Sequence, residues 1–188
     1  MKTPSFFRTA IMLIAVLTAV LLRNNANARL LIAVHHTSLV HSVIDEDSNT
    51  QYVPFTGTKK MRLNNISIHA MRDFMIKYKD VDDASWYEVD NGFVARFTAG
   101  EATTTVTYKK NGEWLYTITS YGEMKMPENI RALVKGTYYD YSIVNIEEVQ
   151  IPYKENNIFL VKMQDATTIK VVRIYEGEME VIHDYTKG

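Results

Sequence analysis

Hydrophobic residues recur with a helical period in one segment early in the chain. The segment runs from Asn64 to about Lys79, and its apolar positions are spaced mostly four residues apart. That spacing places them on one side of a helix, which predicts an amphipathic helix. We expect Asn64 or Asn65 to cap its start by accepting a backbone N–H. The predicted apolar stripe is Ile66, Ala70, Phe74 and Tyr78, with Met71 and Met75 beside it.

Strand-like segments separated by turn signals follow this helix. Asn91-Gly92 and Asn111-Gly112 are tight-turn pairs, and Gly100 marks a third turn. Short connections of this kind join antiparallel strands into a meander. The predicted strands are Ser85–Val89, Phe93–Thr98, Thr103–Tyr108 and Trp114–Tyr121.

The same order of elements then occurs a second time. Pro127 suits the first position of a helix, where its missing N–H is not needed, and Gly136 weakens that helix near its end. The predicted apolar stripe is Ile130, Leu133, Val134 and Tyr138. The predicted strands are Ser142–Ile151, Ile158–Met163, Thr167–Tyr175 and Met179–Tyr185.

Short sequence matches support a tandem arrangement. At offsets of 64 to 66 residues, Ala102-Thr103-Thr104 matches Ala166-Thr167-Thr168, and Asn111-Gly112-Glu113 matches Glu176-Gly177-Glu178. We therefore predict two units of one helix plus four antiparallel strands, at residues 62–122 and 123–188. The expected fold class is α+β, with both helices packed on one face of the sheet or sheets.

The N-terminal residues have the three parts of a signal peptide. Lys2 and Arg8 are basic, Ala10 to Leu22 is uncharged and apolar, and Ala26-Asn27-Ala28 offers small residues for cleavage. The apolar run is shorter than the roughly 20 residues that span a bilayer. We expect cleavage after about Ala28 and a periplasmic or secreted protein; an uncleaved anchor is the alternative. Residues 29–61 form a poorly defined lead.

Composition narrows the function classes. The chain has no cysteine, which excludes disulfides, thiol chemistry and a lipid-bearing cysteine. The formal net charge is −1, and no basic stripe of the kind that binds nucleic acid is present. No segment after the signal peptide is apolar enough for a stable membrane span.

No residue pattern predicts a catalytic or metal site. His35, His36 and His41 form the nearest approach to a metal cluster, but adjacent strand residues point to opposite faces. The acidic group Asp80, Asp82 and Asp83 lacks the glycine and glutamate of a calcium loop. Nucleophile elbows and glycine-rich phosphate loops are absent. We therefore expect no enzyme activity, no metal and no cofactor.

Several of these features resemble a known family. A proline, helix, aromatic and strand signature runs through Met126-Pro127, Tyr138 and Tyr141, and a hairpin carries Asn111-Gly112-Glu113-Trp114. The chain resembles PepSY-like exported proteins of the beta-lactamase-inhibitor-like fold over residues 64–187. One departure is Leu63-Asn64-Asn65, where relatives tend to have a proline. The resemblance implies an exported binding or inhibitory module without catalytic residues.

Alternation along the first four strands divides their residues between two sheet faces. We expect the sets containing Phe93, Val106 and Trp114 to face the helix, together with Tyr116 and Ile118. The opposite face is expected to be open and mostly polar, although a one-residue slip would reverse the assignment. The candidate partner-binding residues there are Trp86, Arg96, Thr105, Thr107, Leu115 and Thr117, among neighbours Glu88 and Thr119.

The resulting hypothesis is a non-enzymatic exported module that binds or inhibits a protein through this open face. Tryptophan and arginine are enriched at binding hot spots, which makes Trp86 and Arg96 the leading anchors, with Leu115 beside them. The alternative is a periplasmic module for a small ligand, a peptide or envelope stress. The identity of the partner and the oligomeric state are not predicted.

Overall fold

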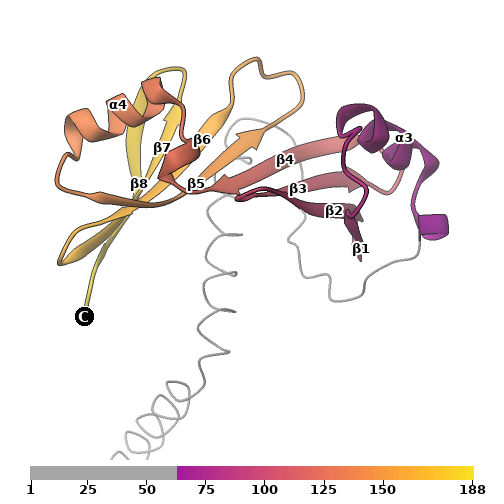
Figure 1. Cartoon of the computed structure of the whole chain (residues 1–188), viewed down its shortest axis with the longest axis horizontal. Coiled ribbons are helices and arrows are strands. Elements are labelled where there is room, and N and C mark those ends of the chain that lie inside the picture. The colour runs from indigo at the N-terminus through magenta and orange to yellow at the C-terminus, as the bar shows by residue number, and fades with distance from the viewer. Residues whose placement is uncertain (1–62) are drawn as a thin grey trace, which may run out of the picture. The chain divides into compact units, whose positions relative to one another are not determined.

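The structure is a computed structural model that describes residues 63–188. These residues form an α+β fold of eight strands and two α-helices (Figure 1). The predictions for residues 1–61, including the signal peptide and the three-histidine group, lie outside the described residues. Within residues 63–188, neither helix combines the length and the hydrophobicity needed to cross a bilayer.

The elements follow the order of two helix-plus-four-strand halves. The N-terminal half, residues 63–121, contains η1 (Leu63–Asn65), α3 (Ile68–Lys77), β1 (Ser85–Val89), β2 (Gly92–Ala99), β3 (Ala102–Lys109) and β4 (Trp114–Tyr121). The C-terminal half, residues 122–188, contains η2 (Glu123–Lys125), α4 (Glu128–Thr137), β5 (Ser142–Gln150), β6 (Ile158–Gln164), β7 (Thr168–Tyr175) and β8 (Glu178–Thr186). The predicted strands agree with these bounds to within two residues at each end.

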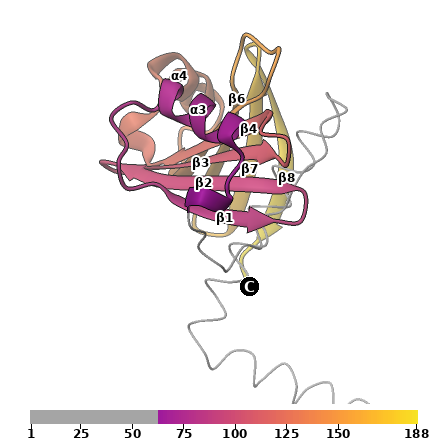
Figure 2. The same ribbon diagram turned by 90° about the vertical axis from the view of Figure 1, so that its right-hand side faces the viewer.

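All eight strands form one antiparallel sheet in sequential order, from β1 to β8. β4 pairs with β5, and this pairing joins the two halves into one continuous sheet. Both helices lie on the same side of it, α3 over the strands of its own half and α4 over the later strands (Figures 1 and 2). The predicted α+β class and the placement of both helices on one face are confirmed.

The first helix begins later than its apolar pattern predicts. A short 3₁₀ turn occupies Leu63–Asn65, and α3 begins at Ile68 with Ser67 as its N-cap and no side-chain capping bond. The prediction that Asn64 or Asn65 caps the helix is therefore wrong. The apolar stripe does face the sheet at Ala70 and Phe74, but Met75 is exposed.

Corresponding helix ends have matching geometry in the two halves, 60 residues apart. The N-caps Ser67 and Pro127 have nearly equal φ and ψ, and so do the C-caps Tyr78 and Tyr138. The backbone N–H of each C-cap residue donates over 2.8 Å to the carbonyl four residues earlier. Pro127 thus precedes the first helical residue, one position before the predicted place.

The side chains beneath the two helices belong to different chemical classes. The core under α3 contains the aromatic residues Phe74, Trp86, Phe93, Phe97 and Tyr108, with Ile66, Ala70, Ala95 and Val106. The core under α4 is mostly aliphatic: Ile130, Val134, Ile146, Val161, Met163, Val172 and Ile174, with Tyr121, Met126 and Tyr141. Each helix therefore packs on its own hydrophobic cluster.

Candidate functional site: the helix-free sheet face

Strand pairing decides which residues face away from the helices. In an antiparallel ladder, residues directly opposite each other project from the same face. Arg96 is opposite Thr105, and Thr105 is opposite Ile118. Their neighbours Ala95 and Val106 belong to the core under α3. Arg96, Thr105 and Ile118 therefore form a row on the helix-free face. Thr107 lies two residues along β3 on the same face, but it is buried and is not an accessible binding residue.

Trp86 lies on the other face, which corrects a prediction. It is opposite Ala95 in the β1–β2 hairpin and is only 3% exposed. Its ring stacks on Tyr108 with centroids 5.9 Å apart and meets Phe74 edge-on at 5.2 Å. The hairpin places even-numbered β1 residues opposite odd-numbered β2 residues, so Trp86 and Glu88 share the face of Phe93. Trp86 is a core residue of the N-terminal half.

A β-bulge reverses the predicted faces along β4. Tyr108 is opposite Trp114, whereas Thr107 is opposite Tyr116, so one extra residue, Leu115, lies between these pairs. An extra residue shifts the alternation of everything after it. The predicted faces of Tyr116 and Ile118 are therefore wrong, because both project to the helix-free side. Thr117 and Thr119 accordingly project to the helix side.

Two contacts confirm the place of Thr117. The Trp114 indole Nε1–H donates to its Oγ1 over 3.1 Å, and the Tyr78 hydroxyl lies 3.3 Å from the same atom. Thr117 is buried by these partners beneath the end of α3. Leu115 is also buried, at the bulge itself. Neither residue therefore offers an exposed anchor.

The exposed part of the helix-free face forms a compact group on the first four strands, which we name the sheet patch. Arg96 and Thr98 are exposed, and the others are half-buried. No hydrogen bond or ion pair joins the Arg96 guanidinium to another residue within 63–188. The sheet patch consists of Tyr87, Arg96, Thr98, Thr103, Thr105 and Ile118.

Farther along, the helix-free face contains buried apolar residues beside a few charged ones. Val149 and Ile158 are directly opposite each other on β5 and β6, and both are buried. Leu160 and Val171 are buried on the same face. The expectation of a broad open face is therefore wrong at these central strands, which carry buried apolar residues on both sides. Lys162 and Arg173 are half-buried on the same face, opposite Val171 and Leu160.

A polar chain lies on the helix side, where α3 meets β3. The Tyr108 hydroxyl donates to Asp73 Oδ2 over 2.9 Å, and Lys77 Nζ is 3.2 Å from the same oxygen. Burial is the main cause of the raised pKa of Tyr108, and the Asp73 carboxylate raises it further. Lys77 also lies 3.8 Å above the Trp114 ring. These contacts tie α3 to the sheet.

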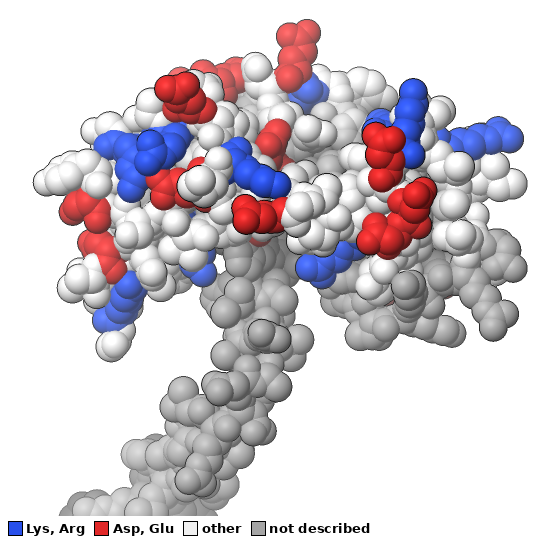
Figure 3. Space-filling model, in the orientation of Figure 1, with Lys and Arg blue, Asp and Glu red and all other residues white. Residues whose placement is uncertain are grey.

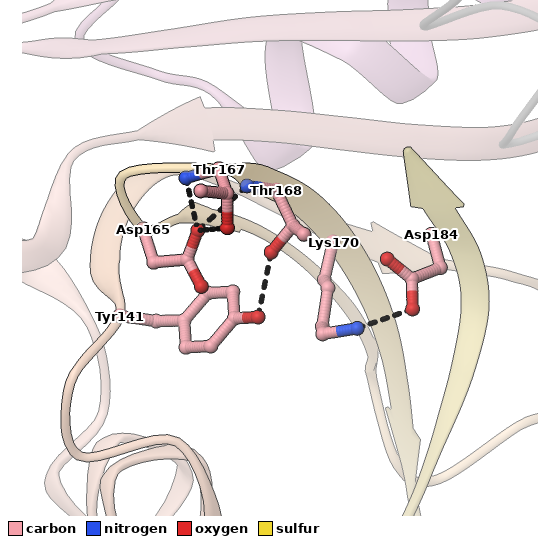
Figure 4. A network of polar contacts seen from close by, with 6 residues as sticks. All are labelled: Tyr141, Asp165, Thr167, Thr168, Lys170 and Asp184. Carbon is pink, nitrogen blue, oxygen red and sulfur yellow. Dashed lines mark hydrogen bonds and ion pairs between the residues drawn. The ribbon is translucent and has the colours of Figure 1, made fainter. Parts of the chain in front are cut away.

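A second polar network stabilises the turn between β6 and β7 (Figure 4). Asp165 Oδ1 accepts the backbone N–H groups of Thr167 and Thr168 over 2.7 and 2.6 Å. These backbone donors hold the pKa of Asp165 well below its usual range. The Tyr141 and Thr168 hydroxyls are 2.7 Å apart, and Lys170 pairs with Asp184. Every polar group in this network has a structural partner.

The described residues contain no group of three or more histidine, cysteine, aspartate or glutamate side chains that could hold a metal ion. Among residues 63–188, His69 is exposed on α3, and His183 stacks on Tyr185 in β8 with centroids 5.6 Å apart. Acidic and basic side chains are mixed over the face that Figure 3 shows.

A hollow of about 610 Å³ is the second candidate site. It lies in the C-terminal half, between the start of α4, the β5–β6 connection and the β7–β8 turn. Sequence reasoning assigned these segments to a helix start and two loops but did not predict that they meet. The available signals were Asn156-Asn157 and Glu176-Gly177, each placed in a loop between two strands. The lining includes three asparagines, two glutamates and two aromatic rings.

Comparison with known proteins identifies the fold but not the activity. No family model matches the chain, and no curated protein matches it. A solved protein of the DUF2874 family from Bacteroides uniformis is similar, with 18% identity and a TM-score of 0.51, over 63% of this chain and 88% of the other.

Two further solved structures give the same result. One is described as a BLIP-like protein, from Bacteroides fragilis, with 16% identity, a TM-score of 0.53 and coverage of 64% and 86%. The other, from Bacteroides eggerthii, belongs to "putative periplasmic proteins", with 16% identity, a TM-score of 0.51 and coverage of 64% and 88%. The chain thus has a BLIP-like fold, as its resemblance to beta-lactamase-inhibitor-like proteins implies.

Proposed function

We propose that the protein is an exported, non-enzymatic binding or inhibitory module that holds a protein partner on the sheet patch. The observation that carries the proposal is the Arg96 guanidinium, which is exposed and has no partner within the described residues. It lies in a row with Thr105 and Ile118, so a cation, a hydroxyl and an apolar side chain are adjacent. Arginine in such mixed surroundings is a typical hot-spot residue.

The chemistry of the sheet patch indicates what the partner presents. A planar guanidinium binds carboxylates through two parallel hydrogen bonds. The threonine hydroxyls of β3 and the Tyr87 ring can add hydrogen bonds and contact area around that ion pair. The partner is therefore a protein with an exposed aspartate or glutamate, and inhibition would follow from covering that surface.

The expected export of the protein completes the proposal. The signal-peptide pattern of residues 1–28 favours the periplasm or the medium. The similar protein from Bacteroides eggerthii is described as periplasmic, and the one from Bacteroides fragilis is described as BLIP-like. PepSY-like character stays a prediction, since the comparisons name only DUF2874 and BLIP-like proteins.

The test is affinity capture from an envelope extract, followed by a binding measurement with the captured protein. The bait is the protein as a bacterial host exports it, beside the variants Arg96→Ala and Arg72→Ala. Arg72 is a matched control, because it is also exposed but lies on α3 across the sheet. We expect Arg96→Ala to weaken binding by about 2 kcal/mol or more and Arg72→Ala to leave it unchanged. Equal binding of the partner by all three proteins would reject the sheet patch as the binding surface.

A second candidate function is small-ligand binding in the second half, favoured by the hollow beside α4. A ligand that binds only the native protein raises its melting temperature, so this function has an independent readout.

A further inference from the structure

The hollow of the C-terminal half is built on a fixed framework. Its floor contains Phe159, opposite Ile174 in the β6–β7 ladder, and Ile130 of α4. Ile130 and Ile174 are buried in the core under α4. Figure 1 shows α4, the β5–β6 connection and the β7–β8 turn at the same end of the C-terminal half. The rim therefore consists of loops held by a packed core.

The loops on the rim have restricted conformations. Glu176 and Gly177 both have positive φ, of 53° and 84°, as in the tight type I′ turn of a hairpin. Asn157 Nδ2 donates to Glu148 Oε1, and the Tyr121 hydroxyl donates to the other oxygen of that carboxylate over 2.8 Å. Tyr121 belongs to the core, so Asn157 is anchored through Glu148. Binding groups fixed in advance lose less entropy when a ligand arrives.

The polar groups of the lining are mainly amides. Asn129 comes from α4, whereas Asn156 and Asn157 come from the β5–β6 connection. An amide both donates and accepts hydrogen bonds, which matches a hydroxyl group. Glu155 and Glu176 add acceptors for pairs of neighbouring hydroxyls. The lining itself contains no lysine or arginine, and the neighbouring Lys154 is turned to the Tyr175 ring.

Aromatic surface is available beside the amides. Tyr175 is half-buried in the lining, and Phe159 is half-buried on the floor. The Tyr175 hydroxyl is hydrogen-bonded to Glu176, which raises the pKa of the tyrosine, and Lys154 lies 5.0 Å from the ring centroid. Lys154 therefore lies over one face of the Tyr175 ring. Aromatic rings next to amides and carboxylates suit a ligand with apolar C–H faces and a polar edge.

We propose that this hollow is a binding site for a neutral sugar unit of a glycan. A pyranose has one face of C–H groups for Tyr175 or Phe159 and a rim of hydroxyls for the asparagines. The volume lies within the range of ordinary small-ligand sites, roughly 300–1,000 Å³. The site is separate from the sheet patch, because its residues lie on the C-terminal half.

The test uses the protein as exported and a panel of methyl glycosides of glucose, galactose, mannose and N-acetylglucosamine. Saturation-transfer NMR and calorimetric titration measure binding. We expect saturable binding of at least one glycoside with a dissociation constant of about 1 mM. Tyr175→Ala and Asn156→Ala should each weaken it about tenfold, which corresponds to about 1.4 kcal/mol.

Matched controls keep this test separate from folding and from the proposed function. Tyr139→Ala and Asn91→Ala remove an exposed tyrosine and an exposed asparagine elsewhere, and sugar binding should stay within about twofold. Arg96→Ala should also bind sugar normally. The proposal fails if no glycoside binds saturably, or if the folded Tyr175→Ala and Asn156→Ala variants bind as well as the parent. Binding of lysine methyl ester in place of sugars would make this a cation site and also reject the proposal.

Discussion

The two halves of the described chain repeat one backbone plan with different side chains. Under α3, Phe74 meets Trp86 and Phe97 edge-on, with centroids 5.2 and 5.8 Å apart. Sixty residues later, Val134 occupies the position of Phe74 and packs among aliphatic residues under α4. The helix-end geometry is nevertheless the same. The fold therefore requires an apolar residue of suitable volume at each position, not a particular chemistry.

The outer surfaces of the helices differ as well. In and before α3, the exposed residues include Leu63, Ile68, Met75 and Ile76. The positions 60 residues later are Glu123, Glu128, Lys135 and Gly136. The C-terminal half thus has an ordinary solvated helix, whereas α3 presents apolar side chains outward.

The largest expected difference between the halves is in core substitutions. Phe74→Ala should lower the free energy of unfolding by about 3–5 kcal/mol, because it removes a ring that contacts three other aromatic side chains. Val134→Ala at the equivalent position should cost about 1–2 kcal/mol, since it removes only two methyl groups. Chemical denaturation monitored by circular dichroism measures both. Equal losses would show that the two cores tolerate cavities alike.

Trp86→Ala extends this comparison to the residue whose predicted sheet face was wrong. It should cost about as much stability as Phe74→Ala, because Trp86 is buried in the same aromatic cluster. A well-folded Trp86→Ala protein that had lost only partner binding would instead indicate that Trp86 belongs to the recognition surface.

The next largest expected difference between the halves is the loss of stability when a turn glycine is replaced by alanine. Gly112 and Gly177 have positive φ of 90° and 84°, so alanine at either should cost about 1–2 kcal/mol in backbone strain. At Gly112, a Cβ would also lie 2.6 Å from Ser67 Oγ and 2.7 Å from the Ala70 backbone nitrogen, whereas at Gly177 it meets open space. We therefore expect Gly112→Ala to be the more destabilising by about 1–3 kcal/mol. Thermal unfolding of both variants checks this; equal melting temperatures would mean that α3 moves away from the turn freely.

The smallest expected effect is a pH dependence that arises at the Asp165 turn of the C-terminal half. Asp165 has a lowered pKa in the folded protein because two backbone N–H groups bind its carboxylate. Its stabilising contribution is therefore complete above the unfolded-state pKa of about 3.9 and is lost as the pH falls below it. In the N-terminal half, the neutral Asn111 Oδ1 accepts a comparable bond from the Glu113 N–H over 3.0 Å.

Two variants separate these turns. Asp165→Asn should flatten the fall in stability between about pH 4 and pH 2. Asn111→Ala should change this fall less, because the pKa of Glu113 at that turn is lowered mainly by Lys109 and only to a smaller extent by Asn111. Urea unfolding at several pH values measures the slopes. An unchanged slope for Asp165→Asn would assign the acid sensitivity to other carboxylates.

Much of the local structure could be predicted from the residues themselves. The eight strands lie close to their predicted bounds, because alternation and turn residues such as Gly100 act over a few positions. The first helix was placed correctly in general but began too early, since Asn64 and Asn65 form a 3₁₀ turn instead of a cap. The side-chain stripe beneath α4 was predicted fully, with Ile130 and Val134 buried.

The candidate site was harder to predict, because it depends on register. Arg96, Thr105 and Thr107 were assigned to the correct face, since β2 and β3 pair without interruption. Thr117 was assigned to the wrong face because the bulge at Leu115 leaves no mark in the alternation of residue types. No local pattern could place Asn129, Asn156 and Tyr175 around one hollow, because they are distant in sequence.

The sequence by itself determined the element types, their order, the turns and the α+β class, since these depend on interactions within a few residues. Tertiary structure decided which face each strand residue occupies, that Trp86 belongs to the core and that Arg96 stays exposed. It also brought the start of α4 and two loops together around the hollow. The physical reason is that pairing register and packing are set by contacts between distant segments. A shift of the register by one residue moves every side chain of a strand to the other face of the sheet.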